Sequence, residues 1–351
     1  MTDTAQQQHV ESPWRSAGPE ERARRRRLLL VVSGLFAAVG AVFGFPTGRD
    51  VLVGWVLLFL FAACAGDLRV WRRAVVHDWL PLFAVLFAYD LLRGGARHVG
   101  AHLAQLPLLR ADELDPTVTA RAHVTEMIHG DQLLFGGHVP TVWLQQHLYT
   151  PGRAHWWDVV AVPVYFSHFV VSLAVAVLLW AVSYRLFRRY VWTLVTLTVI
   201  TLATYALFPA APPWMAGLPA NHALPDVVRV VPATLKALGG HTVSSAVERG
   251  AAYSNRVAAM PSLHGAIPMM LLLFGWPLVR TRTRVLLAAY VVAMLLTLVY
   301  AGEHYVTDIL VGWLYAAASV VGASWWFDRR GREVRSSARA ANAAAARPPA
   351  P

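Results

Sequence analysis

Residues 285–327 read VLLAAYVVAMLLTLVYAGEHYVTDILVGWLYAAASVVGASWWF, two apolar segments joined by a short polar turn. A helix that crosses a bilayer needs about 20 mostly apolar residues, and segments 285–301 and 305–327 are close to that length. Six more apolar segments precede them, at 28–45, 51–65, 78–94, 158–184, 190–208 and 261–279. The pattern predicts an all-α, polytopic membrane helical bundle of about eight transmembrane segments, whose first two segments form full crossings or a re-entrant hairpin.

The composition agrees with a membrane protein that carries polar tails. Hydrophobic residues make up 56% of the 351 residues, above the usage of ordinary globular domains. Residues 28–327 are expected to form the membrane domain. Residues 1–27 and 328–351 are expected to be disordered tails, because they lack the apolar residues to bury a core. The net charge of +11 lies mainly in short arginine runs beside apolar segments, so no nucleic-acid partner is expected.

The arginines predict the orientation in the membrane, because positive charge beside a span is retained in the cytoplasm. With eight crossings, five arginine groups fall on one side: Arg22 and Arg24 to Arg27; Arg69, Arg72 and Arg73; Arg185, Arg188 and Arg189; Arg280, Arg282 and Arg284; Arg329 and Arg330. The long segments 95–157 and 209–260 fall on the other side. The expected localisation is a multi-pass cell-membrane protein with both termini in the cytoplasm.

His304 and Asp308 stand at the head of the last apolar segment, where ionisable residues are expensive and usually functional. Their spacing places both side chains on one face of a helix. The carboxylate can accept a hydrogen bond from one imidazole nitrogen and leave the other nitrogen basic. This arrangement is typical of a prepared nucleophile.

A second motif, AAMPSLHGA at 258–266, begins another apolar segment. Pro261 is expected in the first turn of a helix, where backbone N–H groups lack intrahelical partners. The N–H groups of Ser262, Leu263 and His264 are therefore expected to hold phosphate oxygens, with the helix dipole adding positive charge. By the predicted topology, His264 and His304 meet at the extracytoplasmic surface.

The PSLH and HxxxD motifs resemble the type 2 phosphatidic acid phosphatase superfamily. FPAAPPW at 208–214, VAAMPSLH at 257–264 and PTVWLQ at 140–145 resemble its branch that includes inositol phosphorylceramide synthase, as do YDLLRG at 89–94 and YFSHF at 165–169. The similarity spans roughly residues 80–325. It implies a catalytic core at about 158–327 and a phosphotransferase or phosphatase that acts on a lipid phosphate, either a phospholipid or a polyprenyl phosphate.

The resemblance also implies residue roles. His304 attacks phosphorus to give a phosphohistidine, Asp308 orients His304, and His264 protonates the leaving alcohol. Water, inositol or another alcohol then accepts the phosphoryl group, and nothing in the sequence decides which. No metal and no cofactor are implied. The expected partners are a membrane lipid substrate and the alcohol acceptor.

The chain departs from the superfamily pattern in its basic residues. Thr297 and Leu298 stand where Ser and Arg precede the histidine, and the upstream KxxxxxxRP element is missing. A phosphoryl group in transit needs its charge balanced. Arg93 and Arg256 are the expected substitutes, with Lys236 as a weaker third.

Three features remain open from the sequence. His168 lies in an apolar run and is either a packing residue or a headgroup contact, and Trp214 is either a substrate contact or an ordinary interfacial tryptophan. Residues 140–148 are expected to form an amphipathic interfacial helix. The competing functions are a lipid transporter or non-catalytic scaffold, and a metal-dependent hydrolase that uses His264, His304 and Asp308 as ligands.

Overall fold

The computed structural model describes residues 18–43, 49–85, 123–217, 223–239 and 258–345. These residues form twelve α-helices, one π-helical turn and three isolated β-bridges. In chain order the elements are α2 (Pro19–Phe43), α3 (Arg49–Ala63), α4 (Leu68–Ala74), η1 (Val75–Trp79), α7 (Thr125–Leu134), α8 (Pro140–Leu148), α9 (Trp156–Val182), α10 (Tyr184–Leu207), α11 (Pro213–Ala216), α12 (Val230–Ala237), α14 (Leu263–Gly275), α15 (Thr281–Tyr300) and α16 (Val306–Ala345). The all-α prediction is confirmed for the described part of the chain.

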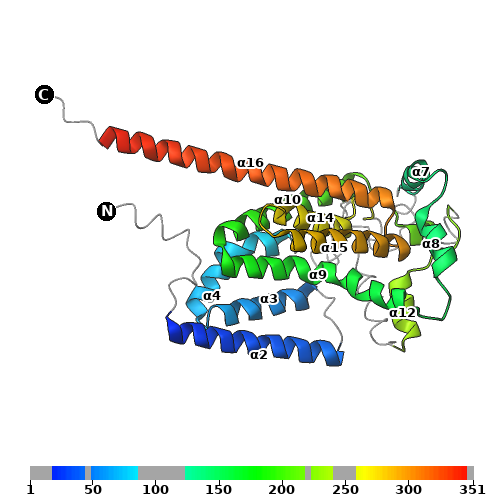
Figure 1. Cartoon of the computed structure of the whole chain (residues 1–351), viewed down its shortest axis with the longest axis horizontal. Helices are drawn as coiled ribbons and strands as arrows, with labels where there is room; N and C mark the ends of the chain where they lie inside the picture. The colour runs from blue at the N-terminus through cyan, green and yellow to red at the C-terminus, as the bar shows by residue number, and fades with distance from the viewer. Residues whose placement is uncertain (1–17, 44–48, 86–122, 218–222, 240–257, 346–351) are drawn as a thin grey trace, which may run out of the picture.

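The long helices run side by side along the long axis of the molecule (Figure 1). Four described helices are long and apolar enough to cross a membrane, namely α9, α10, α15 and the Val306–Glu333 part of α16. Shorter apolar helices cover Val53–Ala63 and Leu263–Gly275. These findings indicate a multi-pass membrane protein. Eight crossings remain a prediction, and part of the expected 78–94 segment lies outside the described residues.

Part of each predicted tail is helical in the described residues. Helix α2 begins at Pro19 and α16 continues to Ala345. Arg25 pairs with Glu21 at 2.8 Å and Arg329 pairs with Glu333 at 3.1 Å, both one helical turn apart. Such pairs and alanine-rich sequence favour helix even where no core is buried, and composition alone does not reveal that preference.

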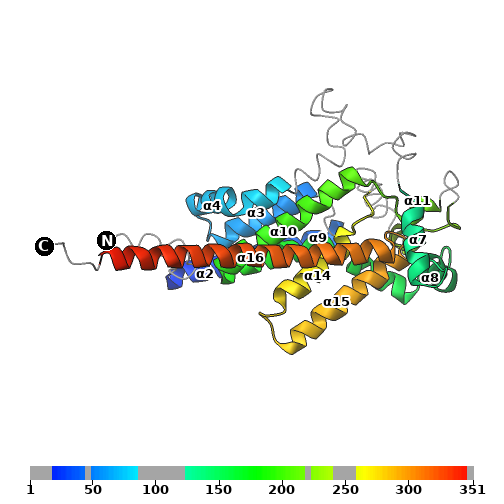
Figure 2. The same cartoon turned by 90° about the horizontal axis from the view of Figure 1, so that it is seen from above.

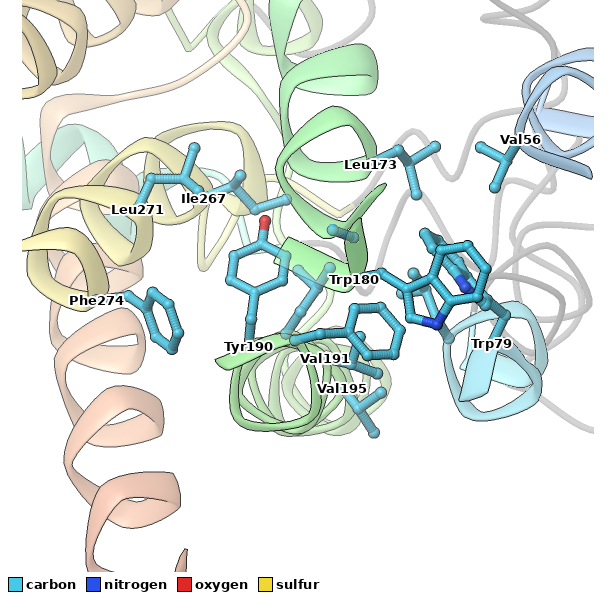
Figure 3. Packing of buried hydrophobic residues seen from close by; sticks show 14 of the residues in the cluster. Val56, Trp79, Leu173, Trp180, Tyr190, Val191, Val195, Ile267, Leu271 and Phe274 are labelled. Atoms are coloured by element: carbon cyan, nitrogen blue, oxygen red, sulfur yellow. The ribbon is translucent and has the colours of Figure 1, made fainter. Parts of the chain in front are cut away.

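The main core lies between α3, η1, α9, α10 and α14 (Figure 3). Trp79 packs against Trp180 and Phe187 with ring centroids 6.2 and 5.2 Å apart. Tyr190 of α10 packs against Phe274 of α14, and its hydroxyl donates to the carbonyl of Ser172 at 3.0 Å. This core fixes α9, α10 and α14 relative to one another.

Helices α7, α8 and α11 lie together at one end of the bundle, opposite α4 and the beginning of α2 (Figures 1 and 2). Two of the arginine groups belong to α2 and α4. The turn between α15 and α16, which carries His304, contacts the α8 end. Arginine-rich elements and the histidine motif therefore occupy opposite ends of the bundle.

Helices α14 and α16 approach closely at two glycines. A Cβ atom on Gly265 would lie 2.8 Å from Ile309 Cγ2, and one on Gly312 would lie 2.5 Å from the carbonyl oxygen of Ser262. Only glycine allows backbones this close without displacement. At Gly265 the backbone of α14 packs against a side chain of α16, and at Gly312 the backbone of α16 packs against the backbone of Ser262.

We expect Gly312→Ala to destabilise the protein by about 1–3 kcal/mol, because the added methyl group would push α14 away from α16. Gly322→Ala on the same helix is the matched control, because a Cβ atom there meets nothing within 4 Å. Thermal unfolding of both purified variants in detergent tests this. Equal melting temperatures would contradict the described contact.

Candidate active site

His304 and Asp308 lie where the turn after α15 enters α16. His304 Nδ1 is 3.5 Å from Asp308 Oδ2, and the exposed fractions of the two residues are 6% and 0%. The same carboxylate oxygen accepts a hydrogen bond from the backbone N–H of Tyr305 at 3.0 Å. The imidazole and the carboxylate thus lie at ion-pair distance, without a hydrogen bond at Nδ1 among the described residues, and Asp308 is held by the second contact.

His264 lies in the first turn of α14 and faces the same place. Its ring centroid is 5.7 Å from that of His304, with the planes inclined by 50°. The structure therefore brings together His264 of α14, Asp308 of α16 and His304 of the turn that precedes α16.

The beginning of α14 differs from the prediction at Ser262. The helix starts at Leu263, and Ser262 is its N-cap residue, with the hydroxyl accepting from the N–H of Gly265 at 3.1 Å. The N–H of Ser262 donates to the carbonyl of Asp308 at 3.0 Å. Ser262 thus joins α14 to α16 and caps the helix, and its N–H is not placed to hold phosphate as expected. Leu263 and His264 keep the expected first-turn positions.

Three extended segments lead into this helix start. Ala210 lies in β-bridges with both His123 and Ala258, and the N–H of Ala259 donates to its carbonyl at 3.0 Å. Ala210 is fully buried, and Tyr205 at the end of α10 donates to the carbonyl of Pro261 at 2.9 Å. The FPAAPPW and AAMPSLH motifs are therefore adjacent, and the first holds the second in place.

Asp131 of α7 caps the beginning of α16. Its fully buried carboxylate accepts from the N–H of Val306 at 3.2 Å, the N–H of Thr307 at 2.9 Å and the hydroxyl of Thr307 at 2.7 Å. Burial raises the pKa of the Asp131 carboxyl, and the three hydrogen bonds oppose that shift. Sequence reasoning missed Asp131, because it lies 175 residues from the helix that it caps and forms no local capping motif with it.

The YFSHF motif of α9 packs against His264. The ring of His168 stacks on that of His264 at 4.1 Å, and Tyr165 lies at 5.2 Å with nearly parallel rings. Phe169 meets His264 edge to face. His168 is buried, so the structure places it beside the histidine pair as part of an aromatic wall that restricts the orientation of His264.

The turn that carries His304 is held by Gln145 of α8. The Gln145 side-chain amide donates to the carbonyls of Val228 and Tyr300, both at 2.8 Å, and accepts from the N–H of Val228 at 2.9 Å. Gly302 in the same turn has φ +76°, and a Cβ atom there would lie 2.9 Å from the Val228 carbonyl oxygen. Helix α8 was predicted correctly, but its buried face is polar while Trp143 is exposed.

A cation and a carboxylate flank His304 on the Trp214 side. Arg229 forms a bidentate ion pair with Glu303, with nitrogen–oxygen distances of 3.0 and 3.2 Å. The Arg229 guanidinium lies 5.0 Å from the centroid of the Trp214 ring, and the N–H of Trp214 donates to the carbonyl of Gly302 at 3.1 Å. Trp214 is thus attached to the histidine turn, and Arg229 is a neighbouring cation that sequence reasoning did not single out.

Comparison with family models gives a match over residues 137–322, and the matched model is the PAP2 superfamily. The chain belongs to the PAP2 superfamily. Comparison with curated proteins and with solved structures found no match. Membership implies a phosphatase or phosphotransferase that acts on phosphate esters. The matched region contains His168, His264, His304 and Asp308, whereas Asp131 precedes it.

This PAP2 superfamily member has an apolar residue where the expected pattern has arginine. Leu298 is fully buried in a cluster with Met294, Val299 and Ile309. Its carbonyl accepts hydrogen bonds from the N–H groups of Glu303 and His304. This position supports the turn and supplies no charge to a phosphate.

Of the three basic residues expected to replace that arginine, only Lys236 lies within the described residues. Arg93 and Arg256 lie outside the described residues, and Lys236 lies exposed on α12. Among the described residues, no group of three or more His, Cys, Asp or Glu side chains has the arrangement of a metal site.

We expect Gln145→Leu to lower stability by about 1–3 kcal/mol and to reduce turnover, because three buried backbone groups would lose their partner. Gln146→Leu is the control, because Gln146 is the next residue of α8 and its side chain is exposed. Thermal unfolding and turnover of a phosphate ester are measured for both variants. Unchanged values for Gln145→Leu would show that the amide does not hold the turn.

Proposed function

We propose that this chain is a membrane phosphotransferase or phosphatase that acts on a lipid phosphate through a phosphohistidine at His304. The observation that carries the proposal is the convergence of His264 from α14 with Asp308 from α16 and His304 from the preceding turn, with ring centroids of the histidines 5.7 Å apart. Membership of the PAP2 superfamily supports the reaction class. The proposed substrates are a phospholipid or a polyprenyl phosphate.

In the first step, a lone pair of His304 attacks phosphorus and the bond to the leaving alcohol oxygen breaks. Asp308 lies beside Nδ1, so Nε2 is the proposed nucleophile. A carboxylate that accepts from Nδ1–H fixes this tautomer and stabilises the positive charge that forms on the ring. His264 donates its proton to the leaving oxygen, a contribution of about 100- to 10,000-fold in rate.

In the second step, water or an alcohol attacks the phosphohistidine. His264, now without its proton, accepts the proton of the incoming hydroxyl group, and the phosphorus–nitrogen bond breaks to regenerate His304. The two steps use the same residues in reverse order. Only the nature of the incoming hydroxyl group separates a phosphatase from a phosphotransferase.

The beginning of α14 is the proposed phosphate-binding element. The first-turn N–H groups of α16 already meet the carboxylates of Asp131 and Asp308, whereas α14 is capped by the neutral Ser262 hydroxyl. A helix beginning without nearby negative charge attracts an anion. Leu263 and His264 contribute the proposed backbone donors, and Arg93 and Arg256 remain the proposed balancing charges.

The branch that includes inositol phosphorylceramide synthase is the proposed relationship within the superfamily. Its support is the shared PTVWLQ, YFSHF and FPAAPPW motifs, which lie on α8, on α9 and before α14 around the histidines. An inositol or another polyol is the corresponding acceptor. Trp214 is the proposed stacking surface for that ring, and His168 the proposed headgroup contact.

The proposed orientation puts the site on the extracytoplasmic side and both termini in the cytoplasm. Its support is the positive charge beside the spans together with the opposite positions of α4 and α8 in the bundle (Figure 1). Eight crossings are part of this proposal.

We expect His304→Ala to abolish turnover and His264→Ala to lower it by about 100- to 10,000-fold. A donor labelled at phosphorus should leave label on the wild-type protein after a rapid quench into alkaline denaturant, and no label on His304→Ala. His77→Ala is the control, because this exposed histidine lies in η1 at the other end of the bundle. Label that persists on His304→Ala would refute the nucleophile, and movement of lipid without phosphate release would favour a transporter.

We expect product analysis to reveal the acceptor. Purified protein is incubated with phosphatidylinositol or with a polyprenyl phosphate, with and without a free polyol, and the products are identified by mass spectrometry. A phosphotransferase forms a new phosphorylated alcohol whose yield depends on the acceptor, whereas a phosphatase releases phosphate at the same rate without it. Absence of either product from all these donors would contradict the proposed lipid substrates.

A further inference from the structure

Asp131 is a fully buried carboxylate on α7. A buried charge is expensive unless hydrogen bonds compensate it. Here the compensation comes entirely from the start of α16, through the N–H of Val306, the N–H of Thr307 and the Thr307 hydroxyl. The start of α16 therefore stabilises the buried carboxylate, and the carboxylate caps this helix start.

The backbone around this cap allows little freedom. A Cβ atom on Gly130 would lie 2.7 Å from Thr307 Oγ1, so α7 and the first turn of α16 are in direct contact. Met127 and Ile128 of α7 are buried in one apolar cluster with Tyr305. Helix α7 thus holds residues 305 to 307 from the side and from the end.

Residues 305 to 307 connect His304 to Asp308. The distance between His304 Nδ1 and Asp308 Oδ2 depends on the conformation of these residues, since one side chain precedes the helix and the other belongs to its first turn. Asp308 also accepts from the N–H of Tyr305. The two carboxylates divide the N–H groups of the turn between them, Asp308 taking the first and Asp131 the next two.

We infer that Asp131 is a positioning residue for the reaction, which holds His304 and Asp308 in register by capping α16 from outside the histidine site. This inference rests on the proposed function of His304 as the nucleophile. The described side-chain hydrogen bonds of Asp131 go to Val306 and Thr307, so its action passes through these two residues. A displacement of about 1 Å at a reacting group can lower a rate by about 100-fold.

Asp131→Asn and Asp131→Ala test the inference. We expect kcat to fall by about 10- to 100-fold with KM changed by less than about threefold, because the substrate site on α14 is retained while the nucleophile is displaced. Thr307→Val removes only the hydroxyl bond and should give a smaller fall in the same direction, even if the Asp131 variants fold poorly.

Asp78→Asn is the matched control. Asp78 is a partly buried carboxylate that accepts from Trp180 Nε1 at 3.0 Å and from the Tyr184 hydroxyl at 2.6 Å, near the other end of the bundle. Its replacement should lower the melting temperature without changing kcat. If Asp78→Asn and Asp131→Asn lower kcat and melting temperature together, Asp131 has only a structural role and the inference fails.

A second measurement separates this inference from the proposed function. The imidazole NMR signals of labelled protein are assigned to His304 by their loss in His304→Gln. Asp131→Asn should shift the His304 signals and their pH titration, and Asp78→Asn should not. An unchanged His304 titration in Asp131→Asn overturns the positioning role whatever the turnover, whereas a shifted titration with full turnover in His304→Ala would overturn the nucleophile alone.

Discussion

The hydrogen bond from the N–H of Ser262 to the carbonyl of Asp308 is the contact on which the site depends. It joins the beginning of α14 to the first turn of α16, and it forms only because Gly312 lets the Ser262 carbonyl approach the α16 backbone. This one junction fixes the beginning of α14, which carries His264, relative to the first turn of α16, which carries Asp308. The ring centroids of His264 and His304 lie 5.7 Å apart because the backbones of the two segments are joined here.

Polar residues stabilise this junction in an otherwise apolar bundle. Buried polar groups destabilise a fold unless they are hydrogen-bonded, so a network of them specifies one arrangement more strongly than apolar contacts do. Gln145 satisfies three backbone groups around the His304 turn, Asp131 caps α16, and Asp158 in the first turn of α9 accepts from the hydroxyl of Tyr300. Each contact fixes the segment 300–308 from a different helix.

The sequence allowed the placement of His264, His304 and Asp308 to be predicted, because its signals are local. The spacing of His304 and Asp308 defines a helix face, and the proline before Ser262 marks a helix beginning. The arginine pattern predicted that both motifs lie at one end of the bundle, and the structure places them together. These predictions needed only short-range geometry and the preference of arginine for one membrane side.

The supporting residues could not be predicted in the same way. Asp131 and Gln145 act on segments more than 150 residues away, and no local pattern marks a cap supplied by another helix. Ser262 was expected to bind phosphate because the N–H groups of a helix start generally lack partners, yet a carbonyl of α16 takes its N–H. Composition did not predict the helical residues 19–27 and 328–345, because the absence of a core does not prevent a helix.

The distribution of charge limits how this site can hold a phosphate. Two carboxylates surround the beginning of α16, so its dipole is already neutralised where a phosphate would otherwise bind. Arg229 is paired with Glu303, so the two side chains together carry no net charge. Leu298 contributes no positive charge. The first turn of α14 contains no acidic residue, but one helix end carries only about half a unit charge. A dianionic phosphate needs more, so the proposed phosphate site also requires side-chain cations.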